Sequence, residues 1–305
     1  MNRCLAILPV ILLSLPALAQ RNQPRNATDE EVRAELPSGV HFEPNISYDD
    51  KSKAQKLDLY LPEKAVGQPR PAVVIVHGGG WSQGDKRRNQ WWRIPAQYAH
   101  DGYVAISINY RLTGEAPWPA QVEDSKAAVR WLRANAKQYG VDPNRIAAYG
   151  NSAGAHLVAL LGLVKKSAGL EGTGPHLDQS SLVQAVCPSA TPTDFLNWGA
   201  PGVLPERLAD TFFAGPPETL NDRARQASPI TYVADDAPPF FLIHGTADRT
   251  VPKMQSDTFA KALRDAGAKQ VRYMIFDDEG HGVFQRQQLL TYPAMKAFFD
   301  EALGD

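Results

Sequence analysis

Apolar residues along the chain fall into short runs that polar and glycine-rich segments separate. Two early segments, residues 40–48 and 56–61, alternate apolar and polar positions, which is typical of half-exposed antiparallel strands. Six later runs are almost continuously apolar, which predicts strands covered on both faces. These runs are residues 72–76, 104–108, 146–149, 183–187, 240–243 and 271–276.

Helical periodicity lies between the later runs. Apolar positions three or four residues apart predict helices over residues 119–139, 153–163, 253–266 and 288–303. Strand followed by helix, repeated, predicts a mainly parallel sheet with helices on both faces, entered through an antiparallel ribbon. We therefore predict an α/β fold with eight strands, whose site lies at the carboxyl ends of the strands.

The N-terminus differs from the rest of the chain. A positive start at Met1-Asn2-Arg3, an apolar run to Pro16 and the small residues up to Ala19 predict a secretory signal peptide (residues 1–19) and a secreted or periplasmic protein. Residues 20–39 are polar and predict a tether or a short helix lying on the domain. No apolar stretch reaches the ~20 residues that span a bilayer, so residues 40–305 are expected to form a catalytic domain outside the membrane.

The charge balance narrows the possible partners. The 305 residues include 32 Lys and Arg against 33 Asp and Glu, for a net charge of -1, and the basic residues are scattered. This balance argues against a nucleic-acid partner and leaves the oligomeric state open.

Loss of the signal peptide would leave Cys187 as the sole cysteine. Its apolar surroundings predict a buried, inert thiol and exclude an intramolecular disulfide.

A Gly-x-Ser-x-Gly segment at residues 150–154 contains the most informative chemistry. It follows a predicted strand and precedes a predicted helix, the order that a nucleophile elbow requires. We predict that Ser152 is a nucleophile held in a strained backbone conformation.

A serine hydroxyl needs a general base, and that base needs an acid to orient it. Asp248 follows the run at residues 240–243, and His281 follows the run at residues 271–276, which gives the order Ser, Asp, His. A turn or helix-cap role for Asp248 stays open. We predict structural roles near the site for His156 and His244.

The segment at residues 77–81, His-Gly-Gly-Gly-Trp, follows another predicted strand. Its backbone amides are candidates for an oxyanion hole, which we assign to Gly79 and Gly80 together with Ala153 behind the nucleophile. The alternative for this segment is a phosphate-binding glycine loop, but residues 77–81 do not have the glycine spacing that such a loop requires. A zinc mechanism lacks an HExxH motif and ligand spacing. We therefore predict chemistry without a metal or cofactor.

These motifs together resemble a known superfamily. In chain order they are His77-Gly-Gly-Gly-Trp81, Asn109-Tyr-Arg-Leu112, Gly150-Asn-Ser-Ala-Gly154, Pro192-Thr-Asp-Phe195, His244-Gly-Thr-Ala-Asp248 and Gly280-His-Gly282. From about Val40 to the C-terminus the chain resembles the α/β-hydrolase superfamily, its hormone-sensitive-lipase-like branch, and especially the bifunctional feruloyl and acetylxylan esterase (BD-FAE-like) group. The resemblance implies a serine esterase whose triad is Ser152, Asp248 and His281.

The substrate is less closely defined than the reaction. The resemblance implies short-acyl or carbohydrate-linked esters, with an amidase or formamidase using the same triad as the alternative. A non-catalytic binding module is a second alternative, which would predict a lost nucleophile or base. Several tryptophans are candidates for lining an acyl or sugar pocket, and buried packing is the competing interpretation for each: Trp81, Trp118, Trp198 and the pair Trp91 and Trp92. Residues 192–229 are long enough for a partial lid.

Overall fold

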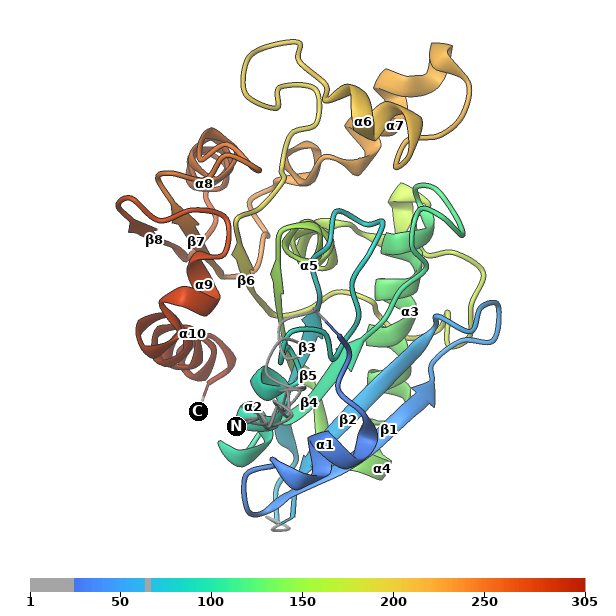
Figure 1. Cartoon of the computed structure of the whole chain (residues 1–305), viewed down its shortest axis with the longest axis vertical. Coiled ribbons are helices and arrows are strands. Elements are labelled where there is room, and N and C mark those ends of the chain that lie inside the picture. Colours follow the sequence, from blue (N-terminus) through green and yellow to red (C-terminus); the bar gives the residue numbers. More distant parts are fainter. Residues whose placement is uncertain (1–24, 64–66, 305) are drawn as a thin grey trace, which may run out of the picture.

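An eight-stranded sheet forms the centre of the molecule (Figure 1). The computed structural model describes residues 25–63 and 67–304. The strands are β1 (Val40–Ser47), β2 (Lys56–Pro62), β3 (Arg70–Val76), β4 (Val104–Ile108), β5 (Val141–Asn151), β6 (Ala185–Ser189), β7 (Phe240–Gly245) and β8 (Val271–Phe276). Their order is β1-β2-β4-β3-β5-β6-β7-β8, and β2 is antiparallel to both of its neighbours while the remaining pairs are parallel. The predicted sheet with its antiparallel N-terminal ribbon is confirmed. The expectation that residues 56–61 form a half-exposed strand is wrong, because residues 57–60 of β2 are all buried.

Helices cover both faces of this sheet (Figure 1). They are α1 (Asp29–Ala34), α2 (Arg93–His100), α3 (Ala120–Ala134), α4 (Ala136–Tyr139), α5 (Ala153–Leu163), α6 (Glu206–Asp210), α7 (Leu220–Ala227), α8 (Met254–Asp265), α9 (Val283–Arg286) and α10 (Gln288–Leu303), with single 3-10 turns η1 (Lys166–Ala168), η2 (Pro217–Thr219) and η3 (Pro229–Tyr232). The four predicted helices are present, although the first breaks into α3 and α4 at Asn135.

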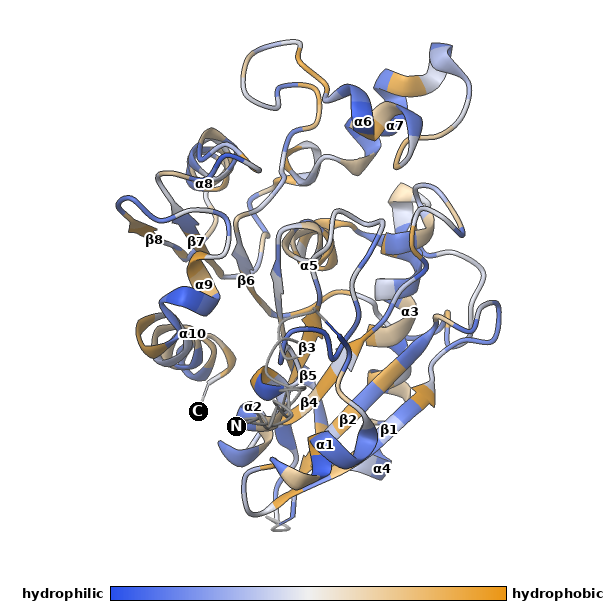
Figure 2. Ribbon diagram, viewed as in Figure 1, coloured by the Kyte–Doolittle hydropathy of each residue, from blue (hydrophilic) through white to orange (hydrophobic). Residues whose placement is uncertain are grey.

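Side-chain alternation along the buried strands divides the core into two layers. On β3, Val74 and Val76 pack with α3, α5 and α8, whereas Val73 and Ile75 pack with α2 and α10. Figure 2 shows hydrophobic residues gathered at β3 and mainly hydrophilic ones along α6. Because both faces are covered, β3 needs apolar residues at successive positions, which explains its continuous apolar run.

The N-terminal segment docks on the domain through α1. Thr28 and Glu31 form a capping box at its start, and Val32 is fully buried. Asp29 pairs with Arg87 of the domain. The short helix that the sequence allowed for residues 20–39 is therefore present, while the predicted signal peptide lies outside the described residues. Within residues 25–63 and 67–304, no helix has the length and apolar character to cross a membrane.

Three further features differ from the sequence expectations or go beyond them. The expectation that the run at residues 271–276 is covered on both faces is wrong, because β8 is the edge strand and its residues are partly exposed. Helix α2 was not predicted. Residues 192–229 contain α6 and α7, which lie at the top of the view in Figure 1, above α3 and α5. Three side chains of this segment are fully buried, those of Phe195, Phe212 and Phe213.

Candidate active site

Ser152 lies on the sharp turn between β5 and α5. Its backbone angles are φ 56° and ψ -119°, a left-handed conformation that non-glycine residues seldom adopt. The turn is held in place because the Ser152 amide donates a 2.9 Å hydrogen bond to the Ser189 carbonyl at the end of β6. This strained conformation is what the nucleophile-elbow hypothesis predicts for Ser152.

The glycines on either side of Ser152 allow close packing of the backbone. A Cβ atom on Gly150 would lie 2.4 Å from the Gly154 carbonyl oxygen, and one on Gly154 would lie 2.0 Å from the Val76 carbonyl oxygen. Any larger residue at these positions would push α5 away from β3 and β5. The Gly-x-Ser-x-Gly pattern is therefore a requirement of helix–strand packing here.

Asp248 and His281 come together from two adjacent strand ends. Asp248 lies in the turn after β7, and His281 lies in the loop after β8. His281 Nδ1 is 2.8 Å from Asp248 Oδ2, and the Asp248 side chain is fully buried while 27% of the His281 side chain is exposed. The structure thus brings together two residues that are 33 positions apart in sequence.

Hydrogen bonds keep the Asp248 carboxylate ionised inside the protein. Burial by itself raises the pKa of a carboxyl group, but the hydrogen bonds from His244, His281 and the Val251 amide hold the pKa of Asp248 below its ordinary value. Asp248 Oδ1 accepts the backbone N–H groups of Thr250 at 2.8 Å and Val251 at 3.0 Å. Such a carboxylate can orient a neighbouring imidazole and stabilise its cation.

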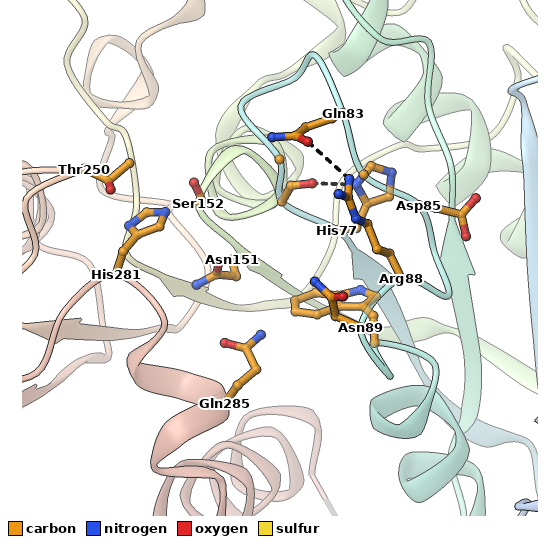
Figure 3. Close-up of a pocket in the computed structure, with 14 residues that line it drawn as sticks. His77, Gln83, Asp85, Arg88, Asn89, Asn151, Ser152, Thr250, His281 and Gln285 are labelled. Carbon is orange, nitrogen blue, oxygen red and sulfur yellow. Dashed lines mark hydrogen bonds between the residues drawn. The ribbon is translucent and has the colours of Figure 1, made fainter. Parts of the chain in front are cut away.

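Ser152 and His281 line one cavity of about 620 Å³. Figure 3 shows the His281 ring beside the Ser152 side chain, with Asn151 and Thr250 nearby. The Ser152 hydroxyl forms no hydrogen bond with another residue in the described part of the chain. Hydrogen bonds between a nucleophile and its base are often long without substrate, so this arrangement remains compatible with proton transfer.

The loop after β3 approaches Ser152 from the other side of the cavity. A Cβ atom placed on Gly78 would lie 3.4 Å from Ser152 Cβ, and Gly79 lines the cavity. Within the described ranges, the N–H groups of Gly79, Gly80 and Ala153 donate no hydrogen bond to another residue. Ala153 is also the first residue of α5, where the helix dipole favours negative charge. Of these three residues, Gly79 is among those that line the cavity, and Gly80 and Ala153 are not.

The structure does not place the three predicted substrate tryptophans at this cavity. Trp81 and Trp118 are 3% and 4% exposed and pack in the core, where the Trp81 ring stacks on Phe212 at 4.3 Å between centroids. Trp198 is partly buried and stacks on Phe195. Trp81 and Trp118 are therefore buried packing residues, as the competing interpretation predicts, because the segment at residues 192–229 covers both rings.

Polar side chains that sequence analysis did not single out line the rest of the cavity, together with Trp91. They are Gln83, Asp85, Arg88, Asn89, Asn151, Thr250 and Gln285. The Trp91 ring stacks on Tyr149 at 5.7 Å. Most of these residues lie in the loop after β3, and no pattern in the sequence distinguishes them from ordinary surface residues.

The remaining predicted structural groups are buried. His156 donates from Nε2 to the Ala227 carbonyl at 2.7 Å and accepts the Trp81 indole N–H at Nδ1 at 3.2 Å. It therefore links α5 to α7 behind the site. Cys187 on β6 is fully buried, which raises the pKa of its thiol well above the ordinary value. The prediction of a buried thiol is confirmed.

Two solved esterase structures are similar to this chain. A truncated carbohydrate esterase from gut microbiota has a TM-score of 0.75 and 30% identity, covering 87% of this chain and 97% of that chain. The butyrate-bound esterase Est2 of Thermogutta terrifontis has a TM-score of 0.70 and 29% identity, covering 87% of this chain and 94% of that chain. The sheet and these neighbours define an α/β-hydrolase fold.

Sequence relatives identify the family within this fold. The BD-FAE family model matches residues 57–263, and the chain belongs to this family. Esterase LipQ of Mycobacterium tuberculosis is 35% identical over 239 residues, which cover 78% of this chain and 56% of LipQ. The chain thus spans little more than half the length of the curated relatives that it matches.

Proposed function

We propose that this chain is a serine carboxylic-ester hydrolase whose catalytic triad is Ser152, Asp248 and His281. The strongest support is the 2.8 Å hydrogen bond from His281 to the buried Asp248 carboxylate, beside a cavity that the strained Ser152 also lines. Its likeness to LipQ and to two solved esterases agrees with this chemistry.

In the proposed mechanism, His281 accepts the Ser152 proton while the hydroxyl attacks the ester carbonyl. The amides of Gly79, Gly80 and Ala153 stabilise the oxyanion. His281 then protonates the departing alcohol, which leaves an acyl group on Ser152. Water, activated by His281, attacks this acyl-enzyme and releases the acid.

The proposed substrates are short-acyl or carbohydrate-linked esters, such as acetyl and feruloyl esters of sugars. Apart from Trp91, the side chains lining the cavity are polar. Amide and guanidinium groups such as those of Asn89, Gln285 and Arg88 can hydrogen-bond to sugar hydroxyls, while Trp91 offers an apolar surface. The similarity to a carbohydrate esterase points the same way.

Replacing the nucleophile tests the reaction. Ser152→Ala should abolish hydrolysis of p-nitrophenyl acetate, acetylated xylan and methyl ferulate without changing the circular dichroism spectrum. Ser167→Ala, at an exposed serine, is the matched control. Retained hydrolysis in Ser152→Ala would refute the triad, and faster turnover of acyl amides than of acyl esters would favour an amidase.

A second variant tests the polar cavity. Gln285→Ala should lower kcat/KM for acetylated xylan and leave that for p-nitrophenyl acetate unchanged, because only the sugar reaches Gln285. Gln288→Ala, at an exposed glutamine outside the cavity, is the control. Equal effects on both substrates would contradict a sugar subsite. Export is tested separately, by locating the enzyme in cell fractions with and without residues 1–19.

A further inference from the structure

A second imidazole contacts the Asp248 carboxylate. His244, at the end of β7, places Nε2 at 3.2 Å from Asp248 Oδ2, the same oxygen that contacts His281. The side chains of His244 and Asp248 are both fully buried. Oδ2 therefore lies between two histidines, one from β7 and one from the loop after β8.

The contacts of His244 determine where its proton lies. Nε2 is also 3.0 Å from the Val251 carbonyl oxygen, and neither this oxygen nor the carboxylate can donate, so Nε2 bears the hydrogen. Nδ1 is 2.7 Å from the hydroxyl of Ser256 on α8, which can donate to it. His244 thus has a hydrogen-bond partner at both nitrogens, and its Nε2, which donates to the Val251 carbonyl, also lies 3.2 Å from Asp248 Oδ2.

We propose that His244 is a positioning residue, which fixes the Asp248 carboxylate so that Oδ2 faces His281. This inference rests on the proposed triad. The contacts to Oδ1 come from Thr250 and Val251, within the same turn as Asp248. His244 instead ties the carboxylate to the central sheet and, through Ser256, to α8. It does not line the cavity, so it acts on the substrate only through Asp248 and His281.

Two effects follow from losing this N–H group. The carboxylate would lose the contact that anchors Oδ2 to the sheet, so fewer molecules would hold His281 in the productive orientation, and kcat would fall about tenfold. Oδ2 would also direct more negative charge at His281, which moves the acid limb of the kcat/KM profile up by about half a pH unit. In the described ranges, the ionisable side chains touching Asp248 are His244 and His281, and the charged side chains at the cavity are Asp85 and Arg88.

Two amide substitutions separate this role from simple packing. His244→Gln keeps an N–H donor near the Nε2 position, whereas His244→Asn reaches only the Nδ1 side, toward Ser256. We expect His244→Asn to show the lower kcat and the shifted profile with an unchanged KM, and His244→Gln to stay within about twofold of the wild type. Should His244→Asn fail to fold, His244→Phe fills the volume of the ring without a donor and replaces it in the comparison.

The result that overturns the inference is a folded His244→Asn or His244→Phe with wild-type kcat and pH profile, or a His244→Gln as impaired as either. Titration of the His281 ring by NMR measures the same coupling without substrate. A shift of this titration in His244→Asn, in a protein that hydrolyses no ester, would sink the proposed function and leave the His244 contact supported. An unshifted titration in a protein that does hydrolyse esters would overturn the His244 inference and leave the proposed function supported.

Discussion

Two buried histidines should make the stability of this protein fall on mild acidification. His156 is fully buried, and burial lowers its pKa from 6.5 to about 3, although the hydrogen bond to Ala227 acts in the opposite direction. The contacts of His156 also favour a neutral ring. A protonated ring would direct an N–H group at the Trp81 N–H that Nδ1 now accepts. Burial lowers the pKa of His77 to about 4 in the same way.

The sign follows from proton uptake by the unfolded chain. Below about pH 6.5 the unfolded chain protonates these histidines and the folded protein does not, so the free energy of unfolding decreases as the pH falls, until the folded pKa is reached. At about pH 5, a unit and a half below 6.5, His156 and His77 each lower the free energy of unfolding by about 2 kcal/mol relative to pH 7.5. This is a large share of the roughly 5–15 kcal/mol that holds a domain folded.

Urea unfolding at about pH 7.5 and 5 measures this loss. In His156→Gln, the glutamine at position 156 does not titrate and His77 remains, so stability should fall by about 2 kcal/mol less than that of the wild type over the same interval. His100→Gln, at an exposed histidine, is the control and should retain the wild-type pH dependence. If His156→Gln loses as much stability on acidification as the wild type, then His156 is not held neutral by burial.

Three further perturbations test the packing. Gly154→Ala would place Cβ 2.0 Å from a backbone oxygen of β3 and should abolish soluble expression, whereas Gly114→Ala meets nothing within 4 Å and should express normally. Asp58→Asn removes the carboxylate that pairs with Arg87 inside the protein, and urea unfolding should show a loss of about 3–5 kcal/mol; an unchanged midpoint would contradict this. Cys187 should react with a thiol reagent in urea and stay unmodified in the native protein, so native labelling would refute its burial.

The parts of the fold that sequence predicted are those with a strong local pattern. All eight strands were recognisable from apolar runs or apolar–polar alternation, although these patterns did not give the burial of β2 or of β8. Helix α2 was missed because its eight residues include Pro95 and no side chain caps its start, so its stability depends on the face it buries against β2 and β4. Exposure at β8 depends on sheet order, which the run at residues 271–276 does not encode.

The same distinction applies to the site. Ser152, Asp248 and His281 could be named as candidates from sequence because each follows an apolar run in the order that an elbow hydrolase requires. The tryptophans could not be assigned in this way, because whether a ring is buried or lines a cavity depends on distant segments. Trp81 is covered by Phe212, which lies 131 positions later in the sequence.

Sheet register explains how the site assembles from distant segments. Val76 at the end of β3 pairs with Gly150 on β5, so the loop with Gly79 and the turn with Ser152 leave neighbouring strands at the same level. Gly245 at the end of β7 pairs with Phe276 on β8, which sets the loops of Asp248 and His281 side by side. Strand β6 joins the two pairs, because it pairs with β5 on one side and with β7 on the other, and its last residue, Ser189, accepts the Ser152 amide. Strand pairing therefore sets the neighbouring strand ends from which the segments with Ser152, Asp248 and His281 leave the sheet.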